Sequence, residues 1–372
     1  MKIAMLGHKD FPSRSGGVES VVLELSARLA KRGYDITAYS RGLHKEKNVY
    51  KELGVTVRRI PTFKSQKLNA MVYSFLATFD ALFRHFDVIH YHALGPSVPL
   101  IIARLFKKRT VATVHGLNWR VDKWKGFASR YIKLGEKIVA KYADAVIVLS
   151  EDTRRYFMET YGRKTVLINN AVPVLEKLPC REIKNRLGLD KDGYILFVGR
   201  ISPEKGLLEL VDGYIASGTN KKLVIAGDVP DNDYGRKLRS KCSGRENIIL
   251  CGFAGGDFLT ELYSNCALYI LPSHTEGLSL SLLEAMECGA RCLVSDIPEN
   301  TSVLGEFGLS FETGSSSALA DGINSSLSSP RTSEQAEKQT AYVRENYDYD
   351  RLVDRYEEVY RRVTERRRHK RT

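Results

Sequence analysis

The chain has 372 residues, of which 43% are hydrophobic and 27% are charged, so a disordered or collagen-like chain is excluded and two domains of ordinary size can each bury a core. The net charge of +13 is unevenly distributed. Residues 1–172 hold 30 basic against 14 acidic side chains, residues 173–360 hold 20 against 29, and residues 361–372 hold 7 against 1. Nucleic acid, anionic lipid and phosphate-rich substrates are all open as partners at this point.

Short β-branched runs alternate with amphipathic stretches along the whole chain. In the first half, strands are predicted at 2–6, 35–39, 55–60, 87–91, 110–114, 145–149 and 165–168, with helices at 18–31, 70–85, 99–106, 127–141 and 152–160. In the second half, strands are predicted at 194–198, 222–226, 248–251, 267–271 and 291–295, with helices at 205–215, 234–242, 257–264, 279–287, 334–345 and 350–365. This alternation favours an α/β protein with two doubly wound parallel sheets, each covered on both faces.

A linker is predicted at residues 169–179, which contain Pro173 and Pro179 and coincide with the change in net charge. No apolar stretch reaches the ~18–20 residues that a membrane-spanning helix needs, and the apolar run at the start is too short for the core of a signal peptide. All six cysteines lie in the second half, without a CxxC motif. We therefore expect a cytoplasmic protein, either soluble or peripheral on the inner face of the cell membrane, with reduced thiols and no bound metal.

Ligands of open parallel sheets bind at the carboxyl ends of the strands, where loops lead into helix N-termini. The first such loop ends in Gly16 and Gly17, whose backbone N–H groups can approach an anion. The loop lacks the GxGxxG pattern, and no acidic residue closes the second strand, where a dinucleotide-binding fold carries its ribose ligand. A Rossmann dehydrogenase is therefore disfavoured, and a glycine turn without a ligand is the alternative interpretation.

Cations and an imidazole follow two further strands. The loop after the first strand of the second half carries Arg200 and Lys205, and a guanidinium and an ammonium at this spacing suit a diphosphate. A solvated lysine in the first turn of a helix is the alternative, although a cation there opposes the helix dipole. His115 follows a strand of the first half and is a candidate for function because of that position. For His90 and His92, which alternate along a strand end, we favour a structural role.

The most specific pattern is LPSHTEGLSLSLLEAMECG at residues 271–289. A strand runs into a loop that holds Glu276, and the following helix bears Glu284 one to two turns in. Each carboxylate accepts several hydrogen bonds and so suits sugar hydroxyls, while the backbone N–H groups of Gly277 and Leu278 lie beside Glu276. An acidic cap and an exposed helical glutamate are the alternative interpretation.

Taken together, these motifs resemble those of the retaining glycosyltransferases of family 4, which have the GT-B fold. The resemblance is carried by GRISPEKG at 199–206, EGLSLSLLEAMECG at 276–289, the Gly-Gly loop near the N-terminus and the histidine after a strand, in the order of the family. Residues 7–41 also resemble a subgroup that assembles bacterial polysaccharides and includes rhamnosyltransferases.

The resemblance implies two Rossmann-like domains that face a central cleft. It implies an acceptor-binding domain at 1–172, rejoined by the closing segment 350–372, and a domain at 173–349 that binds a nucleotide sugar. The roles that it implies are these: Gly16 and Gly17 approach the donor diphosphate, Arg200 and Lys205 neutralise it, Glu276 holds the sugar hydroxyls beside Gly277 and Leu278, Glu284 binds the ribose, Gly252 and Phe253 border the nucleobase, and His115 lies by the reacting carbon. Asp228 receives no role, because the sequence around it departs from the family pattern.

The implied reaction moves a hexose-type sugar, with retention, from a nucleoside-diphosphate sugar to a hydroxyl of a glycan or a polyprenyl-diphosphate-linked acceptor during cell-surface polysaccharide synthesis. A UDP sugar is favoured, with dTDP and GDP sugars as alternatives. Arg200, Lys205 and helix termini would stabilise the departing diphosphate without metal or other cofactor, and a diphosphate oxygen would accept the proton of the acceptor.

Other functions fit the sequence less well. A non-catalytic scaffold that binds sugar nucleotides or membrane through a degenerate transferase site is the alternative, and the intact set of charged motif residues speaks against it. An epimerase or a dehydrogenase lacks support in the motifs, and no aromatic-basic module indicates nucleic acid. The basic first domain and the basic tail are expected to face an anionic membrane or a diphosphate-linked glycan. Residues 64–86 are the hypothetical contact, although an ordinary core-facing helix explains them equally well.

Overall fold

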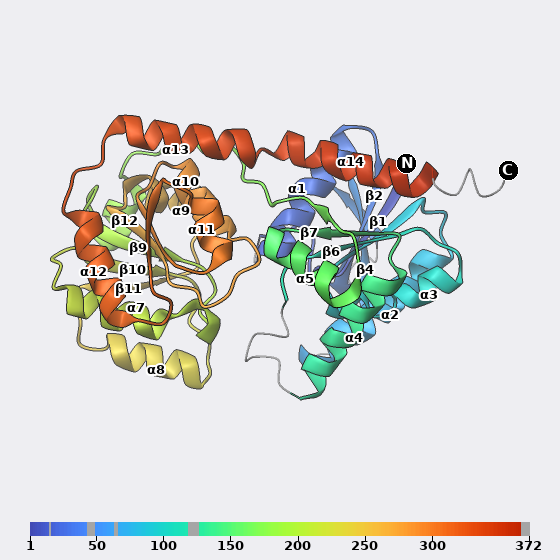
Figure 1. The fold of residues 1–372 in the computed structure, drawn as a ribbon, viewed down its shortest axis with the longest axis horizontal. Helices are drawn as coiled ribbons and strands as arrows, with labels where there is room; N and C mark the ends of the chain where they lie inside the picture. The colour runs from blue at the N-terminus through green and yellow to red at the C-terminus, as the bar shows by residue number, and fades with distance from the viewer. Residues whose placement is uncertain (15, 43–48, 63–65, 118–125, 366–372) are drawn as a thin grey trace. The chain divides into compact units, whose positions relative to one another are not determined.

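The computed structural model describes residues 1–14, 16–42, 49–62, 66–117 and 126–365, and the chain divides into two compact units (Figure 1). Unit 1 comprises Met1–Asn170 and Tyr349–Thr372, and unit 2 comprises Ala171–Asp348. The sequence interpretation placed these boundaries after residues 172 and 349. Within the described ranges, no helix combines the length and the apolar character that a membrane span requires.

The sheet of unit 1 has eight strands in the order β3-β4-β2-β1-β5-β6-β7-β8. Their bounds are β1 (Lys2–Leu6), β2 (Asp35–Gly42), β3 (Val49–Glu52), β4 (Val55–Pro61), β5 (Val88–His92), β6 (Thr110–Val114), β7 (Ala145–Val148) and β8 (Val166–Leu167). Neighbouring strands are parallel, except that β3 pairs antiparallel with β4. The central strands are buried almost throughout, because helices cover both faces of the sheet.

Two groups of helices sandwich this sheet (Figure 1). One face packs against the core helices α2 (Gln66–Leu82), α3 (Leu100–Leu105), α4 (Phe127–Tyr142) and α5 (Glu151–Tyr161). The other face packs against α1 (Gly17–Lys31) and α14 (Tyr349–Glu365). The carboxyl ends of β1, β2, β5 and β6 therefore meet at one edge of the unit, although the strands are far apart in the sequence.

The closing helix α14 belongs to unit 1 because of its apolar stripe. Val353, Tyr356, Tyr360 and Val363 recur every three or four residues and are all buried. The Tyr360 hydroxyl lies 2.8 Å from His90 Nδ1 on β5, and Arg32, which caps the end of α1, forms an ion pair with Asp354 of α14 at 2.5 Å. The helix that the sequence predicted at 350–365 thus docks on the first unit, as the family resemblance implied.

The sheet of unit 2 has six parallel strands in the order β11-β10-β9-β12-β13-β14. Their bounds are β9 (Tyr194–Val198), β10 (Lys222–Ala226), β11 (Ile248–Gly252), β12 (Leu268–Leu271), β13 (Cys292–Ser295) and β14 (Gly308–Phe311). The helices are α6 (Glu182–Leu187), α7 (Leu207–Ser217), α8 (Asp233–Cys242), α9 (Gly256–Asn265), α10 (Leu280–Glu287), α11 (Pro298–Leu304), α12 (Ser316–Leu327) and α13 (Ser333–Asn346).

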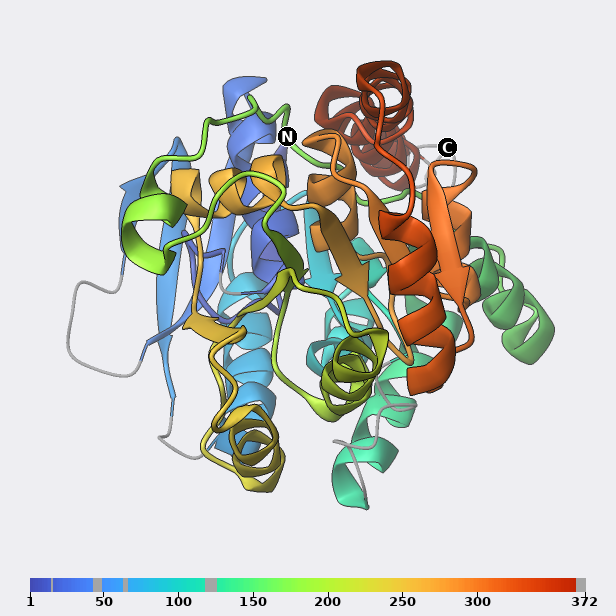
Figure 2. The ribbon, with the colours of Figure 1, turned by 90° about the vertical axis from the view of Figure 1, so that its left-hand side faces the viewer.

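The helices of unit 2 form two layers around its sheet. In Figure 1, α9, α10 and α13 lie above the strands and α7, α8 and α12 lie below them, and α7 and α12 are side by side in both ribbon views (Figure 2). Gly213 of α7 permits this contact, because a Cβ there would come within 2.8 Å of the Leu319 side chain of α12. The two doubly wound α/β units confirm the predicted fold class.

Three parts of the fold differ from the sequence prediction. The antiparallel strand β3 was not predicted, since its residues Val-Tyr-Lys-Glu are mostly exposed at the sheet edge and lack an apolar run. The last strand β14 was also missed, because two of its four residues are exposed. Helices α11 and α12 were not predicted either. In α12, serine and glycine weaken the helical pattern, and Ser315 caps it by accepting a hydrogen bond from the Ala318 N–H at 3.2 Å.

Candidate active site

Two loops of unit 2 meet at the carboxyl ends of β9 and β12. The loop after β9 leads through a short 3₁₀ turn (Pro203–Lys205) into α7, and the loop after β12 leads into α10. Gly206 has a positive φ of 63°, and a Cβ on it would lie 2.2 Å from the Pro272 carbonyl oxygen, so only glycine lets the loops pack this closely. The His274 N–H donates to the Glu204 carbonyl at 2.9 Å, which ties the two loops together.

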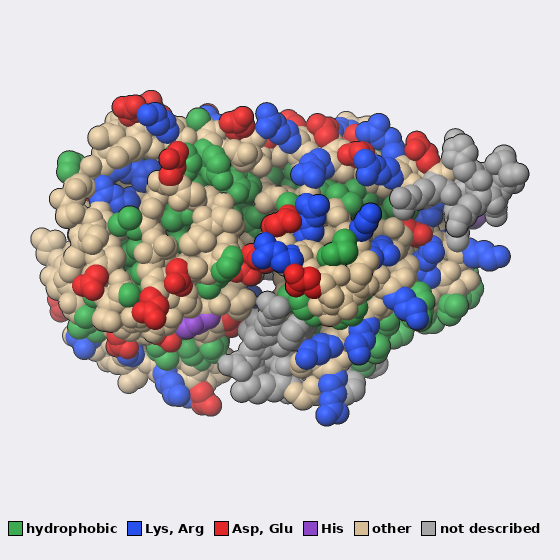
Figure 3. Space-filling view, in the orientation of Figure 1, with side chains coloured by type: hydrophobic (Ala, Val, Ile, Leu, Met, Phe, Trp, Pro, Cys, Tyr) green, Lys and Arg blue, Asp and Glu red, His purple; other side chains and the backbone are tan. Residues whose placement is uncertain are grey.

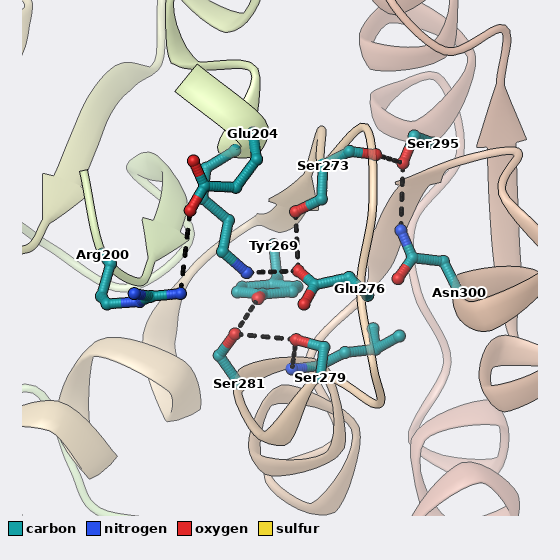
Figure 4. Close-up of polar contacts among 11 residues, drawn as sticks. Arg200, Glu204, Tyr269, Ser273, Glu276, Ser279, Ser281, Ser295 and Asn300 are labelled. Carbon is teal, nitrogen blue, oxygen red and sulfur yellow. Dashed lines mark hydrogen bonds and ion pairs between the residues drawn. The ribbon is translucent and has the colours of Figure 1, made fainter. Parts of the chain in front are cut away.

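Lys205 and Glu276 form the centre of this site (Figure 4). The Lys205 ammonium donates a hydrogen bond to Glu276 Oε1, and the side chains are only 13% and 10% exposed. Ser273 Oγ donates to the same carboxylate oxygen at 2.7 Å. The carboxylate is thus held in one orientation by partners from both loops.

A buried network supports this carboxylate from behind. Ser295 Oγ donates to the Ser273 carbonyl at 2.5 Å, and Asn300 Nδ2 donates to Ser295 Oγ at 3.0 Å (Figure 4). All three side chains are fully buried. Because β13 and α11 supply Ser295 and Asn300, the loop that carries Glu276 is anchored to the body of unit 2.

Arg200 lies on the solvent side of the same loops. Its side chain is 64% exposed, and its nearest carboxylate contact is Glu204 Oε1 at 3.7 Å. The pair is drawn in Figure 4, beside the Lys205–Glu276 contact. A guanidinium with so loose a partner can move to an anion bound near Lys205 without breaking a strong ion pair.

Further motif residues of unit 2 follow Glu276 in the sequence. Gly277 and Leu278 follow Glu276 directly, and Ser279 caps α10 by accepting from the Leu282 N–H at 3.4 Å. On α10, Glu284 accepts a hydrogen bond from the Tyr263 hydroxyl at 3.0 Å. Burial, and then the Glu284 charge, raise the pKa of Tyr263 well above its usual value, so this phenol stays protonated and remains a donor.

The loop after β11 carries a further part of the pattern. Gly252 has a φ of 73°, and the ring of Phe253 is 60% exposed. The Phe253 N–H donates to Asp228 Oδ1 at 3.1 Å, and the Gly227 N–H donates to the Gly252 carbonyl at 2.8 Å. Asp228, to which the sequence assigned no role, therefore positions this loop; its place directly after a parallel strand was the available signal.

The candidate residues of unit 1 lie at the carboxyl edge of its own sheet. Gly16 caps α1 and Gly17 begins it, and a Cβ on Gly16 would lie 2.6 Å from Glu19 Oε2. His115 follows β6, and its Nε2 lies 3.0 Å from His92 Nδ1. Burial lowers the pKa of His115 to about 4, so it is a neutral hydrogen-bonding group near pH 7. His92, which we took as structural, is thus the direct partner of a candidate residue.

The structure brings the predicted residues together in two sets. Unit 2 holds Arg200, Lys205, Gly252, Phe253, Glu276, Gly277, Leu278 and Glu284, and unit 1 holds Gly16, Gly17 and His115. Sequence reasoning missed Ser273, because a serine in a loop has no distinctive pattern. In the ranges that the structure describes, no cluster of histidine, cysteine, aspartate and glutamate suits a metal ion.

Two family models match consecutive parts of the chain. The model described as Glycosyltransferase Family 4 matches residues 15–174, and the model described as Glycosyl transferases group 1 matches residues 180–346. The chain belongs to glycosyltransferase family 4. It is therefore a transferase that acts on sugars, and its two units correspond to the two matched models.

Known relatives of this family 4 enzyme cover much of its length. The O-antigen chain mannosyltransferase C of Escherichia coli is 24% identical over 95% of this chain and 96% of its own. The N-acetyl-alpha-D-glucosaminyl L-malate synthase of Bacillus anthracis is 26% identical over 95% and 96%. A D-inositol 3-phosphate glycosyltransferase of Acidothermus cellulolyticus is 26% identical over 79% and 74%.

Solved structures show the same fold at low sequence identity. Sucrose-phosphate synthase from Thermosynechococcus elongatus aligns with a TM-score of 0.83 and 20% identity over 97% of this chain and 98% of its own. HepE from Anabaena, solved in complex with UDP-glucose, aligns with a TM-score of 0.80 and 18% identity over 96% and 99%. The family 4 enzyme therefore has the GT-B fold that the sequence predicted.

Proposed function

We propose that this glycosyltransferase moves a hexose-type sugar, with retention, from a nucleoside-diphosphate sugar to a hydroxyl of a glycan or a lipid-linked acceptor in cell-surface polysaccharide synthesis. The observation that carries the proposal is the contact between Lys205 and Glu276, with Ser273 on the same carboxylate. In this contact, an ammonium that suits a diphosphate lies next to a carboxylate that suits sugar hydroxyls, at the strand ends where an α/β sheet binds its ligand.

In the proposed mechanism, the donor breaks the contact between Lys205 and Glu276 and binds to both side chains itself. The ammonium turns to the diphosphate, Arg200 reaches it from the solvent side, and Glu276 accepts hydrogen bonds from sugar hydroxyls. Each charge-assisted hydrogen bond contributes about 1.5–3 kcal/mol. As the bond from the anomeric carbon to the diphosphate breaks, the two cations stabilise the charge that grows on the leaving oxygen.

Retention follows in this proposal from attack on the face that the diphosphate leaves. The acceptor hydroxyl approaches on that face, and a diphosphate oxygen takes its proton. Lys205 and Arg200 would stabilise the negative charge of the leaving diphosphate as a metal ion does in other enzymes, so the reaction is proposed to run without a metal ion. Neutral His115 in unit 1 can exchange a hydrogen bond with the sugar, since its other nitrogen is engaged by His92.

The donor is proposed to be a UDP sugar, with dTDP and GDP sugars as the alternatives. HepE, solved with UDP-glucose, supports this choice, as it has the same fold over nearly the whole chain. The Gly252–Phe253 loop would border the base, held in place by Asp228. The mannosyltransferase of Escherichia coli, named for an O-antigen chain, supports a role in polysaccharide assembly.

Unit 1 is proposed to lie against an anionic membrane in the cytoplasm, through the face formed by α2, α3 and α4. Large apolar side chains on this face are strongly exposed: Leu76, Phe79, Phe83, Leu105, Phe106 and Leu134 are between 43% and 77% exposed. Lysine and arginine side chains gather around α3 and α4 in Figure 3. The only described carboxylates on the three helices are engaged: Asp80 is paired with Arg58 and Arg84, and Glu136 is bound by two tyrosines.

An apolar surface rimmed by cations and without unpaired carboxylates suits anionic lipid headgroups. Most of the predicted contact segment 64–86 falls on α2, which presents Leu76 and Phe79 to solvent, and Phe83 follows directly after the helix. The basic tail at residues 366–372 lies outside the described residues. The acceptor would be reached at the membrane surface, which fits a sugar chain built on a polyprenyl diphosphate.

A screen of nucleotide sugars for release of free nucleoside diphosphate tests the proposed function. We expect release with one donor class. Glu276→Ala should lower the rate of release at least 100-fold, because the sugar hydroxyls lose the carboxylate that accepts their hydrogen bonds, while the core of the fold is unchanged. Glu306→Ala, which removes an exposed carboxylate of unit 2, is the matched control and should leave turnover unchanged. Tight donor binding without any release, in the presence of candidate acceptors, would support the scaffold alternative instead.

A further inference from the structure

Four basic side chains stand in a row at the carboxyl edge of the unit 1 sheet. In the spatial order β2-β1-β5-β6, the strands end with Arg41, His8, His92 and His115. His8 and His92 are fully buried, and His92 is hydrogen-bonded to His115. Arg41 and His8, the other half of the row, have no side-chain hydrogen bond to a described residue.

Arg41 is half-buried and carries a charge that no described carboxylate neutralises by direct contact. Its guanidinium carbon lies 5.3 Å from the centre of the Tyr73 ring, which is a cation–π contact. Among the described residues it makes no ion pair within 4.0 Å, and its buried Nε has no hydrogen-bond partner. Burial lowers the pKa of this guanidinium. Cation–π energy of this kind, about 0.5–2 kcal/mol, offsets only part of the cost of burying a charge.

Other half-buried arginines of the same unit are treated differently. Arg58 on β4 binds Asp80 at 3.0 Å, and Arg104 of α3 binds Asp144 at 2.7 Å. Each of these two arginines is in direct contact with a carboxylate within the fold. Arg41 lies at the strand ends where ligands bind, and no carboxylate among the described residues forms an ion pair with it, so it is a candidate cation for a ligand.

Two carboxylates of unit 1, Glu19 and Asp10, have other hydrogen-bond partners. Glu19, at the start of α1, is close enough to act on the Arg41 charge, but its Oε1 accepts the Lys9 N–H at 3.2 Å. Asp10 Oδ1 accepts from the Phe11 N–H at 2.8 Å and from Ser40 Oγ at 3.1 Å. The neighbouring His8 is uncharged, because burial, and then the Arg41 charge, lower its pKa to about 3.

We propose that Arg41 binds a phosphate group of the acceptor at the carboxyl edge of the unit 1 sheet. A guanidinium presents two parallel N–H donors that match a phosphate, and a partly buried position strengthens the contact. His8 lies beside this cation, and its two buried ring nitrogens have no hydrogen-bond partner among the residues that the structure describes. The inference deepens the proposed function, since it assigns a phosphate to the acceptor of that reaction.

Phosphate binding to the full chain, followed by ³¹P NMR line broadening with inorganic phosphate, tests the subsite. Arg200 and Lys205 form a second candidate for phosphate, so the parent is the Arg200→Gln/Lys205→Gln variant. Adding Arg41→Gln should weaken the remaining binding about tenfold or more, because a charged hydrogen-bond fork is lost. Arg41→Lys, which keeps the charge without the fork, should weaken it less. Arg154→Gln, at an exposed arginine of the same unit, should leave it unchanged.

Thermal unfolding separates a ligand site from a structural role. Arg41→Gln should unfold at the temperature of its parent or above it, because no ion pair within the fold is lost. Unchanged phosphate affinity in Arg41→Gln, or a lowered unfolding temperature without any change in phosphate affinity, overturns the proposal. None of these measurements uses a sugar donor, so a failure of the proposed reaction and a failure of the subsite are distinguishable.

Vesicles identify the source of the phosphate. Phosphatidylcholine vesicles with and without a polyprenyl monophosphate are sedimented with the same variants. A gain in binding that depends on the polyprenyl phosphate and on Arg41 places the phosphate on a lipid acceptor. No gain, with inorganic phosphate still bound through Arg41, supports the same subsite with a soluble phosphorylated acceptor. If Arg41→Gln binds both inorganic phosphate and the polyprenyl phosphate vesicles as well as its parent does, the proposal is contradicted for either source of phosphate.

Discussion

Each unit has a cation at the carboxyl edge of its sheet, and the two cations have opposite surroundings. In unit 2, Lys205 is 13% exposed and is engaged by Glu276, which is itself held by Ser273. In unit 1, Arg41 is half-buried against Tyr73 without an ion pair among the described residues. Lys205 is in direct contact with its counter-charge, whereas Arg41 contacts no carboxylate in the part of the chain that the structure describes.

This difference sets how each site can use its binding energy. A donor at Lys205 must replace a contact that already exists, so its net gain is the difference between two charged interactions. In exchange, the ammonium and the carboxylate are positioned before the ligand arrives, which lowers the cost of organising them. An anion at Arg41 replaces no ion pair within the described structure, and it removes the cost of an uncompensated buried charge.

The largest expected effect is on turnover, from breaking the paired site. Lys205→Met should lower the rate of nucleoside-diphosphate release about 100- to 1000-fold, because the leaving group loses a positioned cation. The double variant with Glu276→Ala should be only slightly slower than either single variant, since the two side chains act as a unit. The measurement is the steady-state rate with the donor found in the nucleotide-sugar screen.

Lys237→Met is the control for this prediction, because it removes an exposed lysine of α8 in the same unit. Its rate should match that of the wild-type enzyme. If Lys205→Met keeps a rate within about twofold of wild type, the paired cation takes no part in the reaction. The comparison between the two cations would then lose its functional meaning.

The next largest effect is expected on stability at acid pH, and it comes from His8 beside Arg41 in unit 1. His8 has a folded pKa of about 3, lowered from 6.5 by burial and by Arg41. Below pH 6.5 the unfolded chain therefore binds a proton at His8 that the folded chain does not bind. The contribution of His8 to the free energy of unfolding is complete above pH 6.5 and is lost as the pH falls toward 3. In His8→Asn, the free energy of unfolding should fall less steeply by about 1.4 kcal/mol per pH unit below pH 6.

Urea unfolding between pH 7 and pH 5 measures this slope. His85→Asn, at an exposed histidine after α2, is the control and should keep the wild-type slope. The same pH dependence in wild type and His8→Asn would show that His8 is protonated in the folded protein. An uncharged imidazole beside Arg41 would then be ruled out.

Much of the fold could be predicted from the sequence, because it depends on local patterns. Runs such as Tyr-Ile-Leu-Phe-Val in β9 are buried on both sides and read clearly as parallel strands, and α14 has a regular apolar stripe. The edge strand β3 and the serine-rich helix α12 could not be read in this way. Their stability comes from pairing and packing with distant elements rather than from their own residues.

In the candidate site, too, residues in local motifs could be predicted from the sequence, and residues that only the fold brings together could not. Lys205 and Glu276 are recognisable because each lies in a motif, although their direct contact depends on how the loops after β9 and β12 pack. The row from Arg41 to His115 has no motif, since it exists only when the strands take the order β2-β1-β5-β6. The partner of His115 on β5 was missed for the same reason.

The smallest effect is expected at the surface, where unit 1 again carries exposed groups without partners in the fold. Phe83 on the α2–α4 face is 77% exposed, so Phe83→Ser should leave the stability nearly unchanged. It should weaken binding to vesicles that contain phosphatidylglycerol, measured by sedimentation, by about tenfold. A side chain that enters the lipid interface contributes about 1.5–3 kcal/mol when fully buried and less when partly inserted.

Ile215→Ser on α7 of unit 2 is the control, because the replaced side chain is 40% exposed, and this variant should bind the vesicles as the wild type does. Equal losses in both variants would mean that exposed apolar area alone drives adsorption, whereas a loss confined to Phe83→Ser that also shrinks at high salt requires the cations beside that face.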